Sequence, residues 1–502
     1  MKKREIKKIL IANRGEIALR VIRSAKEMGI KTVAIYSDAD KHALFVRAAD
    51  ESYRIGPPPS NQSYLLGDKI IEIALQCNAD AIHPGYGFLS ENADFAEKVI
   101  NAGLIFIGPP PSAMRKIGDK LSAKQTAKEQ QVPMISGSDG AIRSIDEAKK
   151  VAEKIGFPLL IKASAGGGGK GMRLINTINE LEEGIQRAMS EALSAFGDDA
   201  VFIEKYAEEP KHIEIQILAD HYGNVVYLFE RECSIQRRHQ KVIEEAPSSV
   251  VNEDLRKRMG ECAVALAKAV GYTNAGTVEF LVDKHRNFYF LEVNARLQVE
   301  HPVTEMITGL DLVKEQIKIA MGEPLSFSQE DLKINGHAIE VRVSAEDPLN
   351  NFLPDVGKLL MYQRPQGHGI RVDDGYEEGM EIPIYYDPMI AKLIVHAKDR
   401  NAAIEKMIRA IDEYKIVGVE TTLDFCKFVL RHPDFISGKF DTGFVAKHFQ
   451  PQLLSEPLNQ EEQNVLAIFS SSFFEIEKNK WRVYQHNNLN QEHTSEWYRR
   501  RR

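Results

Sequence analysis

Cysteine is scarce in this chain of 502 residues. Its four cysteines, Cys77, Cys233, Cys262 and Cys426, lie far apart and form no C-x-x-C pair. This spacing suggests neither a disulfide framework nor a zinc site. The cysteine content suits a reducing compartment, so we expect a cytoplasmic protein.

Long apolar runs are also missing. No uninterrupted apolar stretch approaches the roughly 20 residues that a membrane-spanning helix needs. The chain starts with basic residues, as a signal peptide does, but the apolar run that follows ends after four residues, at Asn13. We therefore expect neither export nor membrane insertion. The net charge of -7 argues against a general nucleic-acid binder.

The remaining composition, 43% hydrophobic and 27% charged, is that of a globular protein with about three domains. Residues 7–36 alternate as strand, turn, helix and strand, and further strands are expected within 80–111. Asp38 ends the second strand about where a ribose-binding acid would lie, but the turn before the helix holds one glycine instead of G-x-G-x-x-G. We predict that residues 1–117 form a doubly wound parallel α/β domain that binds no dinucleotide.

A second domain is predicted over residues 118–330, after a helical connector at 117–131. Within it, residues 134–206 alternate strand, glycine run and strand, a pattern typical of a mobile flap. Strands expected between 207 and 330 favour an antiparallel sheet with hairpin turns. Strands near 337–346, 357–364 and 391–398 and a helix at 402–414 indicate a third α+β domain, 331–447. Residues 448–502 form a polar tail rich in Asn and Gln.

A glycine run in the second domain, residues 166–169, lies between two predicted strands. Its bare backbone N–H groups can fold over phosphate oxygens more closely than larger residues allow. The run is not a Walker loop, because G-x-x-x-x-G-K-[ST] is absent. Lys162, on the preceding strand, is placed to reach the same phosphates; an ordinary exposed lysine is the plain alternative.

Three oxygen-bearing side chains are expected to converge on the antiparallel sheet. Glu292 and Asn294 stand two apart on one strand and so share a face, and Glu279 can lie beside them on the neighbouring strand. Mg²⁺ favours such oxygen ligands together with phosphate oxygens. We predict a metal–nucleotide site here; the alternative is that these are ordinary carboxylates on a solvent-exposed face of the strands.

Polar side chains follow this site closely. Arg296, Gln298 and Glu300 alternate immediately beyond it, either as a solvated edge strand or as an anion site. An arginine fork can hold bicarbonate or another small carboxylate, and Glu300, charged at neutral pH, can accept a proton. Upstream, the segment 235–241 adds a basic cluster that can contact the same anion.

Taken together, these motifs resemble those of the biotin carboxylases, a branch of the ATP-grasp ligases. The resemblance spans residues 1 to about 447, and it is carried by segments such as IANRGEIALRVIR, AIHPGYGFLSEN, IKASAGGGGKGMR, IQRRHQKVIEEAP, NARLQVEHPVTE and YYDPMIAKL. It implies an ATP-grasp fold with an N-terminal doubly wound parallel-sheet domain and a C-terminal biotin-carboxylase-type domain. The activity implied is ATP-dependent carboxylation of biotin with bicarbonate, through carboxyphosphate.

The resemblance also implies roles for individual residues. The residues implied to hold ATP are Lys120, Lys162, Gly168, Gly169, Glu204, Lys205, Tyr206, Ala207, His212, Gln236 and His239. Glu279, Glu292 and Asn294 are implied to hold two Mg²⁺ or Mn²⁺ ions. Bicarbonate is implied to lie against Lys241, Arg296, Gln298 and the backbone of Val299. Glu300 is implied to deprotonate it, and Arg342 to stabilise the biotin enolate.

Partners follow from the same resemblance. The chain contains no A-M-K-M-like biotinylation site, so biotin is expected on a separate biotin carboxyl carrier protein, with a carboxyltransferase as a further partner. Family members are typically homodimers. Lys170, where many bacterial acetyl-CoA carboxylase subunits have Arg, is similar to propionyl- and methylcrotonyl-type enzymes, and it leaves the acyl-CoA open between acetyl-CoA, as in fatty acid biosynthesis, and propionyl-CoA. The tail is hypothesised to contact one of these partners.

Two alternatives remain at this point. Another bicarbonate- or carboxylate-activating ATP-grasp ligase, such as a carbamoyl phosphate synthetase large chain, shares the glycine loop and the metal carboxylates. That chain is a tandem duplication, whereas no internal repeat is visible here. A degenerate ATP-binding subunit would have lost Glu279, Glu292, Asn294 or Arg296, and all four are present.

Overall fold

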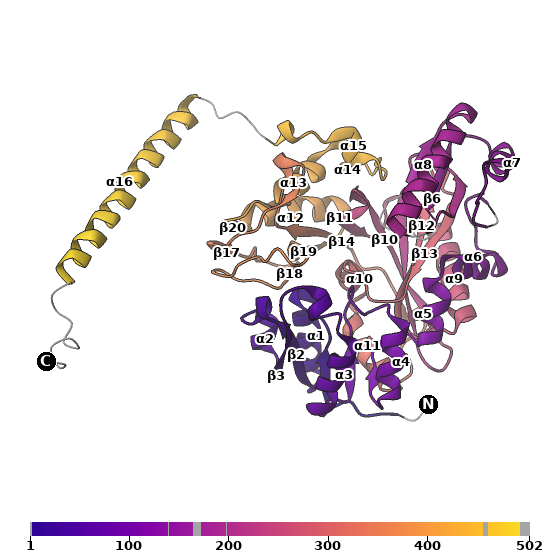
Figure 1. Cartoon of the computed structure of the whole chain (residues 1–502), viewed down its shortest axis with the longest axis horizontal. Helices are drawn as coiled ribbons and strands as arrows, with labels where there is room; N and C mark the ends of the chain where they lie inside the picture. The colour runs from indigo at the N-terminus through magenta and orange to yellow at the C-terminus, as the bar shows by residue number, and fades with distance from the viewer. Residues whose placement is uncertain (1–2, 139, 164–171, 197, 455–459, 492–502) are drawn as a thin grey trace. The chain divides into compact units, whose positions relative to one another are not determined.

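The structure is a computed structural model that describes residues 3–138, 140–163, 172–196, 198–454 and 460–491. It divides into two compact units, residues 1–449 and 450–502. Among the described residues, no helix is long and apolar enough to cross a membrane. The described part of the larger unit contains two main sheets, a three-stranded sheet and two two-stranded pairs. Figure 1 shows how its strands and helices are arranged.

The N-terminal sheet is parallel, with the strand order β3-β2-β1-β4-β5. Its strands are β1 (Lys8–Ile11), β2 (Lys31–Ser37), β3 (Glu51–Gly56), β4 (Ala81–His83) and β5 (Ile105–Phe106). The helices between them are α1 (Gly15–Glu27), α2 (Leu44–Ala48), α3 (Gly67–Gln76) and α4 (Ala93–Asn101). The predicted doubly wound parallel fold is confirmed. Strand β3 was not predicted, because as an edge strand it carries polar and charged residues that give little periodic signal.

The predicted helical connector is two helices, α5 (Pro111–Gly118) and α6 (Lys120–Glu129). Asp119 separates them with an extended backbone, φ -83° and ψ 113°. Its carboxylate accepts the N–H of Ser122 at 2.7 Å, which caps the second helix. The predicted connector is therefore helical on both sides of Asp119 and interrupted at that residue.

The region predicted to be a flap contains a three-stranded antiparallel sheet, β7-β6-β8. Its elements are α7 (Ile145–Ile155), β6 (Leu159–Ala163), β7 (Met172–Ile175), α8 (Ile178–Phe196) and β8 (Val201–Lys205). Buried Ile161, Ile185 and Ile203 form its core with both helices. The glycine run 166–169 lies outside the described residues.

An eight-stranded antiparallel sheet dominates the rest of the unit, with the order β13-β12-β9-β10-β11-β14-β19-β18. Its strands are β9 (Lys211–Ala219), β10 (Val225–Arg237), β11 (Gln240–Ala246), β12 (Asn274–Val282), β13 (Phe288–Asn294), β14 (His337–Ser344), β18 (Ile370–Asp374) and β19 (Met389–Ala397). Because β11 pairs with β14, placing Ile243 opposite Val341, the sheet runs across the predicted domain boundary near 330.

Strand β11 was not predicted; the basic cluster noted at 235–241 overlaps only its first two residues. The strand forms a hairpin with β10 through Arg238 and His239, which have φ values of 50° and 64°. Two consecutive residues with positive φ turn the chain tightly enough to bring the ends of β10 and β11 together. The hairpin places Gln236 opposite Lys241 on the neighbouring strand, a pairing that the sequence did not predict.

The helices that flank the large sheet complete its core. They are α9 (Glu253–Val270), α10 (His301–Thr308), α11 (Leu312–Ala320), α12 (Arg400–Glu413), α13 (Leu423–Arg431), α14 (Pro433–Ile436) and α15 (Phe444–His448). Two short pairs, β15 (Glu346–Asp347) with β16 (Leu353–Pro354) and β17 (Met361–Gln363) with β20 (Lys415–Val417), lie outside the large sheet. The strand predicted at 357–364 is thus reduced to β17.

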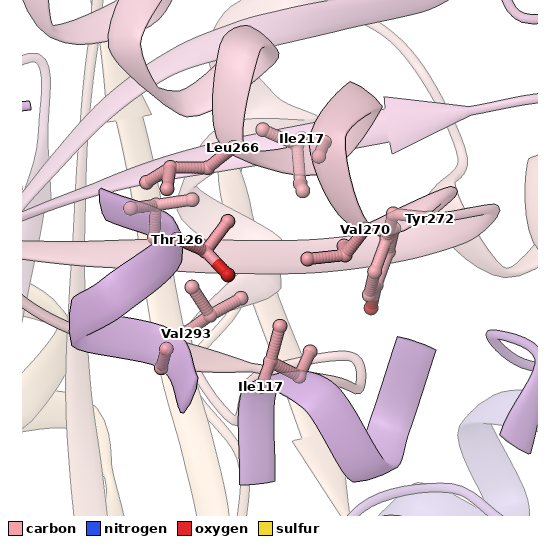
Figure 2. A pocket seen from close by; sticks show the side chains of 10 residues that line it. Ile117, Thr126, Ile217, Leu266, Val270, Tyr272 and Val293 are labelled. Carbon is pink, nitrogen blue, oxygen red and sulfur yellow. The ribbon is translucent and has the colours of Figure 1, made fainter. Parts of the chain in front are cut away.

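A small apolar cavity lies beneath α9, lined by residues such as Ile117, Leu266, Val270 and Val293 (Figure 2). Its volume of about 10 Å³ is at the lower limit for one water molecule. The cavity is too small for a substrate and is a packing feature of the core.

The second unit contains α16 (Gln460–Gln491), a helix where only a polar tail was expected. Among the side chains that the structure describes, this helix exposes Val465, Leu466, Ile468, Phe469, Phe473, Phe474 and Ile476.

Candidate active-site cleft

A cleft of about 1260 Å³ opens where the large sheet, the small sheet and the N-terminal loops meet. Of the residues singled out in the sequence, it is lined by Lys162, Glu204, Lys205, Tyr206, Ala207, His212, Gln236, His239, Lys241, Glu279, Glu292, Asn294, Arg296, Gln298, Val299 and Arg342. Residues from distant parts of the chain therefore share one space. Gly168, Gly169 and the side chain of Lys120 lie outside what the structure describes.

The carboxylates predicted to hold metal lie on adjacent strands. Glu279 of β12 is directly opposite Glu292 of β13, so both side chains leave the same face of the sheet. The amide of Asn294 donates to Glu279 Oε1 at 3.0 Å. His212 Nε2 lies 2.8 Å from the other oxygen of Glu279. The structure therefore places the three oxygen-bearing side chains, Glu279, Glu292 and Asn294, on one face of the sheet, as predicted.

Lys241 joins this corner to the rest of the cleft. Its ammonium donates to Glu214 at 2.6 Å, to Glu279 at 2.9 Å and to Glu300 at 2.6 Å. Burial lowers the pKa of Lys241, but the three carboxylates outweigh this and raise it well above 10.5. Burial works to raise the pKa of Glu279, and Lys241 and His212 together hold it well below its ordinary value. Lys241 is thus a fixed positive charge among three acids.

Glu300 is completely buried at the start of α10. In addition to Lys241, it accepts an N–H from Arg342 at 3.0 Å, and Arg342 also donates to Glu244 at 2.7 Å. Burial favours the protonated form of Glu300, but Lys241 and Arg342 dominate and lower its pKa well below 4.5. Glu300 is therefore ionised, and it is a weak base for as long as both cations stay in contact with it.

Arg296 and Gln298 lie in the irregular segment between β13 and α10, so the edge strand considered for this segment is not present. Arg296 donates to Gln298 Oε1 at 2.9 Å and to Asn294 Oδ1 at 3.1 Å. Its Nε donates to Glu91 at 2.8 Å, and the other oxygen of Glu91 accepts the N–H of Ala295 at 2.8 Å. A carboxylate from an N-terminal loop thus orients the guanidinium.

The small sheet supplies a second group of charges. Glu204 at the end of β8 accepts from Lys162 at 2.5 Å and from Lys124 at 2.5 Å. Burial works to raise the pKa of Glu204, but the two lysines lower it to about 2. Across the cleft, Gln236 Nε2 lies 2.7 Å from His212 Nδ1. His239 is at the exposed hairpin turn and so approaches the cleft only from its rim.

Sequence reasoning missed several charged residues that hold this arrangement. Glu91 orients Arg296, Glu244 pairs with Arg342, and Glu214 lies between Lys241 and Arg231. Glu214 and Arg231 are fully buried. A signal was available, because charged residues within otherwise apolar strands such as HIEIQILAD indicate paired partners inside the protein.

Comparison with known proteins places the chain in a family. Profiles described as "Biotin carboxylase, N-terminal domain", "Carbamoyl-phosphate synthase L chain, ATP binding domain" and "Biotin carboxylase C-terminal domain" match residues 5–114, 119–328 and 340–447. Biotin carboxylase 1 of Bacillus subtilis is 53% identical over 441 residues, which are 88% of this chain and 98% of the relative. The chain belongs to the biotin carboxylase family.

Other members of the biotin carboxylase family are equally similar. A pyruvate carboxylase subunit of Methanothermobacter thermautotrophicus is 52% identical, with 94% of this chain and 96% of the relative covered. The propionyl-CoA carboxylase alpha chain of Ruegeria pomeroyi is 54% identical, and the match covers 88% of this chain and 68% of the relative. The family is thus shared by carboxylases with different acceptors.

Solved structures agree with this assignment. A Campylobacter jejuni biotin carboxylase complex with β-γ-ATP has a TM-score of 0.85 and 50% identity, covering 88% of this chain and 99% of that one. The biotin carboxylase domain dimer of Hydrogenobacter thermophilus 2-oxoglutarate carboxylase, with MgADP, ADP and bicarbonate, has a TM-score of 0.85 and 48% identity, covering 90% of this chain and 99% of that one. The predicted ATP-grasp fold of the biotin carboxylases is confirmed.

Proposed function

We propose that this chain carboxylates biotin on a separate carrier protein, using ATP and bicarbonate, as the first half-reaction of an acyl-CoA carboxylase. One observation carries the proposal. The groups predicted to bind bicarbonate, Lys241, Arg296 and Gln298, line the same cleft as the predicted metal residues, and Lys241 contacts Glu279 directly. An anion held there would lie beside the phosphates of a metal-bound nucleotide.

ATP is proposed to occupy the part of the cleft next to the small sheet. Lys162 and Lys120 supply cations for its phosphates, and Gly168 and Gly169 cover them from the flap. The segment Glu204–Ala207 and the residues His212, Gln236 and His239 bind the remainder of the nucleotide. Support comes from the shared cleft and from the nucleotides bound in the related solved structures.

The residues proposed to hold metal fit two Mg²⁺ or Mn²⁺ ions. Glu279, Glu292 and Asn294 offer carboxylate and amide oxygens on one face of adjacent strands, the ligand type these ions prefer. When bound, the ions neutralise phosphate charge during phosphoryl transfer. The amide of Asn294 already bonds to Glu279, which keeps the two side chains directed to the same place.

Bicarbonate is proposed to bind Arg296, Gln298, Lys241 and the backbone of Val299. Lys241 then shares its charge with the anion instead of giving all of it to the carboxylates, which restores basicity to Glu300. Glu300 takes the bicarbonate proton, and a bicarbonate oxygen attacks the γ-phosphorus as ADP leaves. Positioning of this weak nucleophile by Arg296 is the main contribution of the site.

The carboxyphosphate formed breaks down to CO₂ and phosphate. The phosphate removes the N1 proton of biotin, and N1 then attacks CO₂ to give carboxybiotin. Arg342 is proposed to stabilise the negative charge of the biotin enolate. Its pKa is raised far above the ordinary value, because Glu244 and Glu300 outweigh the effect of burial, so it stays a cation throughout.

The partners are proposed from the same reaction. A biotin carboxyl carrier protein delivers the biotin, a carboxyltransferase uses the product, and the enzyme acts as a homodimer. The related 2-oxoglutarate carboxylase domain is a dimer, which supports the last point. The exposed apolar side chains of α16 support contact between residues 448–502 and one partner.

The final acceptor is proposed to be an acyl-CoA, of the acetyl-CoA or propionyl-CoA type. The relative from Ruegeria pomeroyi, named for propionyl-CoA, supports this. Pyruvate is the competing acceptor, because the match to the pyruvate carboxylase relative covers 96% of that protein. Transfer of labelled carboxyl groups to each acceptor, with the carboxyltransferase present, distinguishes them.

The test of the half-reaction is ADP release from ATP and Mg²⁺, with and without bicarbonate and free biotin. We expect turnover that both compounds stimulate, and loss of that stimulation in Arg296→Ala. Arg115→Ala is the matched control, because Arg115 also pairs with carboxylates but at the exposed N-terminal surface. Turnover indifferent to bicarbonate and biotin would contradict the proposed function.

A further inference from the structure

Lys392 is a buried lysine on β19, next to the residues of the proposed biotin and bicarbonate site. Its side chain has no exposed surface. In the sheet it lies directly opposite Arg342 of β14 on one side and opposite Asp373 of β18 on the other. Cross-strand neighbours share a face of the sheet, so the side chains of Lys392 and Arg342 leave the same face.

The partners of Lys392 come from three separate parts of the chain. Its ammonium donates to the backbone carbonyl of Val299 at 3.0 Å. It lies 3.2 Å from a carboxylate oxygen of Glu16 at the start of α1, and 3.9 Å from Asp373. Glu16 in turn accepts a hydrogen bond from the hydroxyl of Tyr86, which lines the cleft.

Two neighbouring cations thus hold two consecutive residues. Lys392 bonds to the carbonyl of Val299, and Arg342 bonds to the carboxylate of Glu300 at 3.0 Å. The carbonyl of Val299 belongs to the peptide that joins it to Glu300, so Lys392 fixes the orientation of this peptide. Burying an ammonium is costly unless hydrogen bonds and opposite charges compensate. An apolar residue would pack at this position without that cost, but it would leave the carbonyl without its donor.

We propose that Lys392 is a positioning residue for bicarbonate: it holds the Val299–Glu300 peptide in place beneath the anion and links it, through Glu16, to Tyr86 on the wall of the cleft. The inference deepens the proposed function and rests on it. Lys392 itself touches no reacting atom, and it acts through the backbone of Val299.

The test compares three variants in the ADP-release assay, with bicarbonate and ATP varied separately. Lys392→Met removes the donor, and Glu16→Gln removes the carboxylate but leaves the donor. The double variant Lys392→Met/Glu16→Gln removes both, so no unpaired Glu16 remains if Lys392→Met alone folds poorly. Asp373 keeps its bidentate pair with Arg371 in all three.

We expect the KM for bicarbonate to rise roughly tenfold or more in both variants that lack Lys392. The KM for ATP should stay within about twofold, because the nucleotide groups are held by other elements, and Glu16→Gln should move the bicarbonate KM much less. Lys8→Met is the control. Lys8 likewise donates to a carboxylate, Glu51 at 2.6 Å, and to a carbonyl, that of Cys77 at 2.8 Å, but away from the cleft.

An unchanged bicarbonate KM in the double variant would overturn the proposal, as would an equal rise in the KM for ATP. Glu16→Gln reproducing the full effect would also overturn it, because the ion pair and not the carbonyl contact would then matter. These outcomes can be distinguished from failure of the proposed function. In that case the wild-type enzyme itself would show no bicarbonate-dependent turnover, and the proposal for Lys392 would fall with the proposed function.

Discussion

Arg231 provides the most direct test of how the interior of the large sheet is stabilised. Its side chain has no exposed surface, and its Nε pairs with the equally buried Glu214. The same guanidinium donates to Gln216 at 2.7 Å, to Thr304 at 3.0 Å and to Thr277 at 3.1 Å. Arg231→Met keeps much of the apolar volume but removes one of the two cations that pair with Glu214, leaving Lys241 alone, and it takes the arginine donor away from these oxygens.

The expected cost follows from this burial. Removing one partner of a buried ion pair destabilises a protein by about 3–5 kcal/mol when the other charge is left without it, and here Glu214 keeps only Lys241 while three polar side chains lose their donor. At about 2.1 cal/mol/K for each residue, the unfolding entropy of the compact unit of residues 1–449 is about 0.9 kcal/mol/K. We therefore expect Arg231→Met to lower the Tm by about 3–5 °C. Arg231→Met/Glu214→Gln should recover part of this loss, since the buried carboxylate that lost its guanidinium is gone.

The assay is thermal unfolding of the purified variants at one pH and salt concentration. Arg54→Met is the matched control, because Arg54 also bonds to a carboxylate, Asp38, through two nitrogens but is 54% exposed. Exposed pairs contribute little, so its Tm should stay within about 1 °C. A similar Tm for Arg231→Met and Arg54→Met would refute the reasoning, and so would a double variant less stable than Arg231→Met.

Three further predictions concern pH and metal. Burial works to raise the pKa of Glu245, but His337 and Arg400 lower it to about 2, so the stability that Glu245 contributes is complete above pH 4.5 and is lost as the pH falls toward 2. Glu245→Gln should therefore lower the Tm at pH 7 by an amount equivalent to about 3 kcal/mol. A Tm difference between this variant and the wild type that did not shrink below pH 4.5 would contradict this. Burial lowers the pKa of His83 to about 4, so the buried ring stays neutral while the unfolded chain gains a proton below pH 6.5. The wild-type Tm should therefore fall between pH 6.5 and 4, and the Tm of His83→Gln should fall less. Parallel pH profiles of the two proteins would disprove this. ATP should raise the Tm in the presence of Mg²⁺; EDTA should abolish this rise, and Glu292→Gln should reduce it. A rise in Tm that ATP causes without metal would argue against the predicted metal ligands.

Much of the fold was predictable because its signals are local. The strand–helix–strand pattern of residues 7–36 and the hairpins of the large sheet depend on periodicity and turn residues within short windows. Predictions failed where a distant partner decides the structure. Strand β11 is stabilised by pairing with β14, which lies about a hundred residues later, and the exposed edge strand β3 has little periodic pattern of its own.

The sequence by itself determined which chemical groups are available. Glu292 and Asn294 stand two apart on one strand, so their side chains share a face whatever the rest of the fold does, and the recognisable motifs place the chain in its family. Only the tertiary structure decided how these groups are held. Glu91 reaches Arg296 across about two hundred residues, and Lys392 reaches Val299 across 93. Such contacts form when separate elements pack together to bury charge, and no local pattern in the chain records which partners will meet.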